Sequence, residues 1–152
     1  MILPFDSDSR IAYYQLLDEM FDSNFWSDGS LTRRFEEDFS AFVNLPHSVA
    51  TSSGGMALLG LLEYVDVRGA EVIVPTNTFM ATPLAVKRAG GKVVFADCSK
   101  NDLCITLEEV KRLANPKTRA VMVVHIGGHI AFEIEEISAF CRKKVGYLEN
   151  EL

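Results

Sequence analysis

The sequence contains 152 residues, about the length of one domain and enough chain to bury a hydrophobic core. Hydrophobic residues make up 48% of it and charged residues 24%, a balance that excludes wholesale disorder. The net charge of -6 argues against nucleic acid or an anionic membrane surface as a partner.

Two further features bear on the compartment. The longest apolar stretch, residues 120–132, is interrupted by two histidines and is shorter than a membrane span. The first residues lack the basic segment of a secretory signal peptide, since the short apolar start, residues 1–5, is followed directly by the acidic residues Asp6 and Asp8. The cysteines show no C-x-x-C spacing and are expected to be free thiols: Cys98, Cys104 and Cys141. These features predict a cytoplasmic protein with no membrane partner.

The first elements predicted along the chain are two helices. Residues 11–21 and 31–43 both place apolar side chains at helical spacing. Asp28 or Ser30 is the expected N-cap of the second helix, since short polar side chains accept the first amides of a helix. We therefore expect residues 1–45 to form a helical lead-in.

Residues 46–148 are predicted to alternate strands with helices. The expected strands are residues 48–52, 71–74, 92–96 and 119–124. The expected helices are residues 55–64, 81–89, 107–114, with Thr106 as N-cap, and 133–144. Strands that are apolar throughout and separated by helices indicate a parallel sheet with helices on both faces. The predicted fold class is α/β with three layers, αβα, in one domain over residues 1–152.

A Ser-Ser-Gly-Gly turn stands between the first predicted strand and the helix that follows it. Gly54 and Gly55 let the backbone approach a ligand closely, and the first amides of the helix, with its dipole, favour a phosphate. The alternative is that the glycines only make a tight turn. No Gly-Lys-Ser/Thr follows, and G-x-G-x-x-G is absent, so neither nucleotide-binding motif is present.

A serine hydrolase is a second interpretation. Ser53, Asp97 and His125 occur in the chain order of the α/β-hydrolase triad. The nucleophile elbow, however, requires glycine two residues before the serine, where this sequence has Thr51. We therefore keep the hydrolase only as a minor alternative.

A metal site is a third interpretation, prompted by two histidines. His125 and His129 are four residues apart, but a catalytic zinc ion typically takes a third protein ligand. The sequence indicates no third ligand, so no metal is expected and His125 is assigned a structural or site-wall role. Asp97 and Asp102 are interpreted as loop or capping residues.

Five ordered blocks, between about residue 10 and about residue 145, resemble one family. The blocks are FEEDFSAFV (35–43), SSGGMAL (52–58), EVIVPTNTFMAT (71–82), GKVVFAD (91–97) and AVMVVHIGG (120–128). They are similar to the DegT/DnrJ/StrS family of pyridoxal-phosphate-dependent nucleotide-sugar aminotransferases. The resemblance implies part of the large domain of a type I, aspartate-aminotransferase-like transferase, in a homodimer with active sites at the subunit interface.

The resemblance also implies a reaction. Members transfer an amino group, commonly from glutamate, to a keto-sugar linked to a nucleotide, for cell-surface polysaccharides or antibiotics. Other members deoxygenate the sugar instead, so the family does not decide the reaction by itself.

Four cofactor-binding residues follow from the resemblance. Gly54, Gly55 and Met56 match the phosphate-binding turn, and Gly55 stands where the family usually has a hydroxyl residue. Phe79 matches the aromatic residue that stacks on the pyridine ring; by position alone it would be a core side chain. His125 and Gly128 match a V-H-x-x-G segment.

No catalytic residue is assigned. The Schiff-base lysine and the aspartate that pairs with the pyridinium belong to family segments that the sequence does not match; Glu151 aligns with the aspartate only by counting. We therefore expect a truncated large domain without the small C-terminal domain, weak or absent binding of pyridoxal phosphate, and no activity alone. The alternative is a non-catalytic fragment that binds a partner chain or a phosphorylated ligand.

Overall fold

The computed structural model describes residues 5–144, and the chain divides into two compact units, Met1–Thr51 and Ser52–Leu152. The end of the predicted strand–helix alternation, residues 145–148, and Glu151 lie outside the described residues. Within the described part, no helix is both long and apolar enough to cross a membrane.

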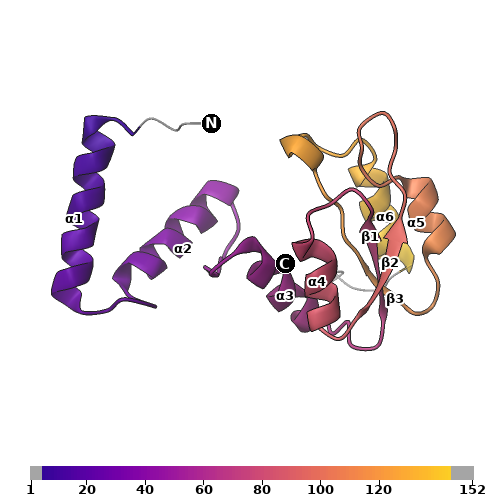
Figure 1. Cartoon of the computed structure of the whole chain (residues 1–152), viewed down its shortest axis with the longest axis horizontal. Helices are drawn as coiled ribbons and strands as arrows, with labels where there is room; N and C mark the ends of the chain where they lie inside the picture. Colours follow the sequence, from indigo (N-terminus) through magenta and orange to yellow (C-terminus); the bar gives the residue numbers. More distant parts are fainter. Residues whose placement is uncertain (1–4, 145–152) are drawn as a thin grey trace. The chain divides into compact units, whose positions relative to one another are not determined.

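The first unit contains two helices, α1 (Ser7–Ser23) and α2 (Ser30–Val43), as predicted (Figure 1). Both end at an asparagine in the left-handed conformation, a common way to terminate a helix. The predicted N-cap of α2 is wrong, because Gly29 occupies that position. Asp28 has a left-handed backbone (φ 53°), and Ser30 is already helical.

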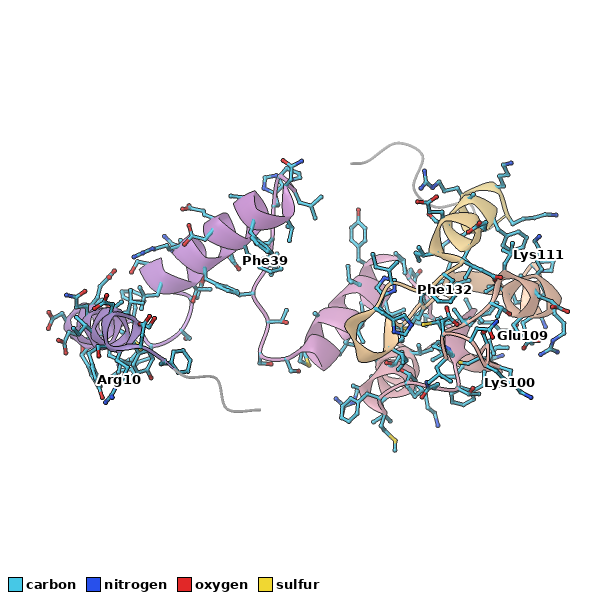
Figure 2. The ribbon with its side chains drawn as sticks, turned by 90° about the horizontal axis from the view of Figure 1, so that it is seen from above. Arg10, Phe39, Lys100, Glu109, Lys111 and Phe132 are labelled. Carbon is cyan, nitrogen blue, oxygen red and sulfur yellow. The ribbon has the colours of Figure 1, made fainter. Side chains whose placement is uncertain are left out.

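No residue between 5 and 51 is buried, so this unit has no core of its own within the described part. Three aromatic rings follow one another along α2: those of Phe35 and Phe39 are 6.0 Å apart, and those of Phe39 and Phe42 are 6.5 Å apart. Phe39 is labelled in Figure 2. Helices of this kind normally bury their apolar stripe, and here the stripe remains exposed.

The strand predicted at residues 48–52 is wrong, since the described structure assigns no strand to that segment. Ser48 Oγ donates to the carbonyl oxygen of Glu36 at 2.6 Å, and the amide of Ala50 donates to Glu36 Oε1 at 2.7 Å. Glu36 of α2 therefore binds this segment. Its carboxylate accepts the amide of Ala50, which is then not available to pair with a neighbouring strand.

The second unit contains a three-stranded parallel sheet in the order β2-β1-β3, from β1 (Glu71–Pro75), β2 (Lys92–Ala96) and β3 (Thr118–Val121). The third strand is shorter than predicted. Its last bond to β1 runs from the amide of Met122 to the carbonyl of Ile73 at 2.9 Å. The next bond would need an N–H from Pro75, which proline lacks, so the pairing ends there.

Helices cover both faces of this sheet (Figure 1). They are α3 (Gly54–Tyr64), α4 (Ala81–Arg88), α5 (Leu107–Leu113) and α6 (Ile134–Lys144). Side chains alternate along β1, which is buried from Val72 onward: Val72 and Val74 pack with residues of α3 and α4, whereas Ile73 packs with residues of α5 and α6. The predicted three-layer α/β fold is confirmed.

Candidate functional site

The N-terminus of α3 is capped by Ser53. Its Oγ accepts the amide of Met56 at 3.3 Å, and its carbonyl accepts the amides of Met56 and Ala57, each at 3.0 Å. The first two amides of the helix, those of Gly54 and Gly55, have no acceptor inside the helix. Of the three predicted phosphate-binding amides, that of Met56 is therefore engaged by the cap, whereas those of Gly54 and Gly55 have no acceptor within α3.

The two glycines are not needed for a strained turn. Both belong to α3, and neither has a positive φ. A Cβ added at Gly54 meets no heavy atom within 4 Å, and one at Gly55 lies 3.6 Å from the Cβ of Ala81. The tight-turn interpretation is thus wrong: glycine here leaves free space beside the helix N-terminus, which permits close approach of a ligand.

Phe79 follows the carboxyl end of β1 and its side chain is 80% exposed. The core interpretation of this residue is therefore wrong. Its backbone is held in place, because its carbonyl accepts the amide of Thr82 at 3.0 Å and the hydroxyl groups of Thr78 and Thr82 lie 2.7 Å apart. The ring is left free to contact a ligand.

All four predicted binding residues line one open pocket of about 810 Å³. Gly54, Gly55 and Met56 form its wall on α3, and Phe79 stands at the start of the α4 side. The fold thus brings together residues from two segments separated by a strand. The N-terminus of a helix and an exposed aromatic face thus share one concave surface, an arrangement that can accept a phosphorylated aromatic ligand.

The rest of the pocket wall on α4 was not predicted from the sequence. Ala81, Leu84, Ala85 and Arg88 line the pocket along one side of that helix. Leu84, Ala85 and Arg88 follow Ala81 by three, four and seven residues, which is the helical repeat, so periodicity counted from Ala81 along the predicted helix would have found them. Arg88 is the one charged side chain among the described residues of this lining, and its charge favours an anionic ligand.

The hydrolase interpretation is wrong. In the triad the aspartate accepts the Nδ1 proton of the histidine, but Nδ1 of His125 accepts the amide of Ala131 at 3.1 Å. Asp97 Oδ1 instead accepts the amide of Cys98 at 2.8 Å. His125 holds the loop after β3, in agreement with its predicted structural role.

Asp102 is a loop residue, as predicted. Its Oδ1 accepts the amide of Cys104 at 3.1 Å, and its Oδ2 accepts the amide of Phe132 at 2.9 Å. The bond from Phe132 is the main reason that the pKa of the Asp102 carboxyl lies below its usual value. One ionised carboxylate thus joins the loops that follow β2 and β3.

Residues 9–148 match the DegT/DnrJ/EryC1/StrS aminotransferase family. The chain is 37% identical over 134 residues to GDP-perosamine synthase of Vibrio cholerae, covering 87% of this chain and 36% of that protein. It is 30% identical over 120 residues to GDP-4-keto-6-deoxy-D-mannose 3-dehydratase of Yersinia pseudotuberculosis, covering 74% of this chain and 30% of that protein.

A solved structure supports the fold assignment. NtdA from Bacillus subtilis, determined with bound cofactor PMP, superposes with a TM-score of 0.83 at 27% identity, over 91% of this chain and 32% of that one. The predicted class, part of an aspartate-aminotransferase-like large domain, is confirmed. The chain spans about a third of the length of the relatives it matches.

Proposed function

Because the chain belongs to the DegT/DnrJ/EryC1/StrS aminotransferase family, we propose that it forms the phosphate- and ring-binding part of a pyridoxal-phosphate-dependent enzyme that acts on a nucleotide-linked keto-sugar. One observation carries this proposal: Gly54, Gly55 and Phe79 line the same pocket. The family indicates which cofactor is bound, and the shared pocket supports the assignment of these residues to it.

Each residue has a physical role in the proposal. The amides of Gly54 and Gly55 donate to the cofactor phosphate at the positive end of the α3 dipole. The ring of Phe79 stacks on the pyridine ring, which orients it and excludes water, for about 0.5–1.5 kcal/mol beyond burial. When bound, the cofactor supplies an electron sink for reactions next to an amine. The residues that match the family are proposed to bind the cofactor, and none of them is proposed to be catalytic.

Amino transfer is the reaction that we propose. The relative named as a perosamine synthase is more similar to this chain than the relative named as a dehydratase, at 37% against 30% identity. Glutamate is the proposed amino donor, and a nucleotide-linked sugar for polysaccharide or antibiotic synthesis is the proposed substrate. We further propose a cytoplasmic homodimer.

The binding role is tested by adding inorganic phosphate, and then pyridoxal phosphate, to the isotope-labelled 152-residue chain. Amide NMR signals of Gly54 and Gly55 should shift with both ligands, and the ring signals of Phe79 should shift with pyridoxal phosphate alone.

Two glycine substitutions provide a matched pair. Gly54→Val places a bulky side chain at the helix N-terminus and should abolish the phosphate shifts. Gly60→Val, in the same helix, is the control, because a Cβ at either position meets no heavy atom within 4 Å. Folded protein with no shift at Gly54 or Gly55, or equal binding by both variants, would contradict the proposal.

A further inference from the structure

Two loops on the carboxyl side of the sheet bring three metal-binding side chains together. Asp102 and Cys104 come from the loop after β2, and His129 comes from the loop after β3. One potential ligand atom from each lies within 4.8 Å of the other two. Cys104 Sγ and His129 Nε2 are 3.7 Å apart, although 25 residues separate them in the chain.

The first loop is fixed by its own backbone. Leu103, between the two ligands, adopts a left-handed conformation (φ 59°), and Asp102 Oδ1 accepts the amide of Cys104. The carbonyl of Cys104 in turn accepts the amide of Ser99 at 2.9 Å. Asp102 and Cys104 are 7% and 1% exposed, so both side chains are held inside the protein.

The second loop positions the histidine. Gly127 and Gly128 have φ of 66° and 86°, values that favour glycine, and the chain reverses there just before His129. The amide of Phe132, a residue labelled in Figure 2, donates to Asp102 Oδ2 at 2.9 Å, and its ring lies 6.2 Å from that of His129. The same carboxylate therefore joins both loops, and the imidazole is placed beside the thiol.

The donor set favours a borderline-soft divalent cation. A thiolate, an imidazole nitrogen and a carboxylate oxygen are the three ligand types that zinc takes in proteins. With ligand bonds of about 2.3 Å to sulfur and 2.0–2.1 Å to nitrogen, a tetrahedral site separates these atoms by about 3.6 Å. The observed 3.7 Å between Cys104 Sγ and His129 Nε2 corresponds to that separation.

The charges of these side chains also favour a divalent cation. A buried thiolate next to a buried carboxylate carries two negative charges, which a divalent cation neutralises. In the described structure Cys104 Sγ donates to the carbonyl oxygen of Asp102 at 3.4 Å.

We propose that Asp102, Cys104 and His129 bind a zinc ion that joins the loops after β2 and β3. Binding releases the thiol proton of Cys104 to solvent and forms Zn–S, Zn–N and Zn–O bonds. His129 is exposed, so the fourth position is open to water. His125 is not a ligand: its Nδ1 accepts the amide of Ala131, so the neutral imidazole carries its proton on Nε2 and has no free nitrogen for a metal. The third ligand that the sequence did not indicate comes from the preceding loop.

Cobalt is a suitable probe, because it replaces zinc in such sites and is coloured. The reduced 152-residue chain, without pyridoxal phosphate, is titrated with Co²⁺. We expect one equivalent to bind, with a thiolate-to-cobalt charge-transfer band in the near ultraviolet and intense visible bands of four-coordinate Co²⁺. One equivalent of Zn²⁺ should remove both, and Zn²⁺ should raise the thermal unfolding midpoint.

Two variants test proposed ligands, and two others serve as controls. Cys104→Ser should lose the charge-transfer band, and His129→Gln should weaken Co²⁺ binding by more than about tenfold. Cys98→Ser and His47→Gln are the matched controls and should bind as the parent does. His129 is exposed, so His129→Gln tests the site even where Cys104→Ser fails to fold by circular dichroism.

Three results would overturn the proposal: no stoichiometric Co²⁺ binding, a thiolate band that persists in folded Cys104→Ser, or unchanged affinity in His129→Gln. Each would show that the three side chains form only a hydrogen-bonded cluster. None of these readouts depends on pyridoxal phosphate, so they are independent of the proposed enzyme function.

Discussion

Arg112 holds both carboxylate oxygens of Glu109: Nε donates to Oε1 and Nη2 to Oε2, each at 2.7 Å. Glu109 Oε2 also accepts the amide of Asp97 at 3.1 Å, which ties the first turn of α5 to the end of β2. The bonds from Arg112, followed by that from Asp97, lower the pKa of Glu109 from 4.5 to about 2.

This pKa predicts how stability depends on pH. Above pH 4.5 Glu109 is ionised in both states, and its contribution to stability is complete. As the pH falls from about 4.5 to about 2, the unfolded chain binds a proton before the folded chain does, so this contribution is lost. Urea midpoints measured across that range should fall less steeply in Glu109→Gln than in the parent. Glu108→Gln, in the same turn, serves as control; a parallel fall in all three proteins would contradict the prediction.

Gly55→Ser should tighten phosphate binding. The new Cβ has room, since it lies 3.6 Å from the Cβ of Ala81, and the hydroxyl adds a donor next to the free amides. We expect a several-fold lower dissociation constant, measured by titration of the amide shifts. Gly55→Ala, which adds the Cβ without the hydroxyl, should leave the constant nearly unchanged.

Two glycine-to-alanine changes should have opposite effects on stability. Gly60 is exposed within α3 and a Cβ there meets nothing, so Gly60→Ala should stabilise by about 0.5–1 kcal/mol. At Gly91 the same atom would lie 3.0 Å from Val86 Cγ1 and 3.2 Å from Val67 Cγ2. Gly91→Ala should therefore destabilise by about 1–3 kcal/mol. Denaturant unfolding compares the two, and equal signs would be the contrary result.

The isolated chain should self-associate. β2 is an outer strand of the described sheet, and Phe95 on it is 53% exposed, which leaves an apolar strand edge unprotected. We expect a concentration-dependent elution volume in size-exclusion chromatography, and weaker association in Phe95→Lys. Val49→Lys, outside the sheet, is the control. A dispersed monomer at all concentrations would contradict this prediction.

The chain alone should not transfer amino groups. Every lysine is exposed, and none lines the pocket next to Phe79; two of them, Lys100 and Lys111, are labelled in Figure 2. Incubation with pyridoxal phosphate, borohydride reduction and peptide mapping should give scattered, substoichiometric labelling. Stoichiometric label on one lysine, together with amino transfer to a keto-sugar, would show a complete catalyst.

The sequence by itself determined the helices and strands that depend on residues close together in the chain. The strand at Lys92–Ala96 matches its prediction residue for residue, and Thr106 caps α5 by accepting the amide of Glu109 at 3.2 Å, as predicted. Apolar periodicity and capping act within a few residues, so they can be recognised along the chain. The order of the five blocks likewise indicated the family, and with it Gly54 and Phe79 as candidate binding residues.

The tertiary structure alone decided the rest. Glu36 binds the segment that was predicted as the first strand, and Pro75 ends the pairing of β3 early. The contact between Cys104 and His129 depends on where two parallel strands end in space, and no pattern along the sequence predicts that arrangement. Contacts between residues far apart in the chain arise only when the sheet forms, because the packing of β1 between two helix layers places those loops side by side.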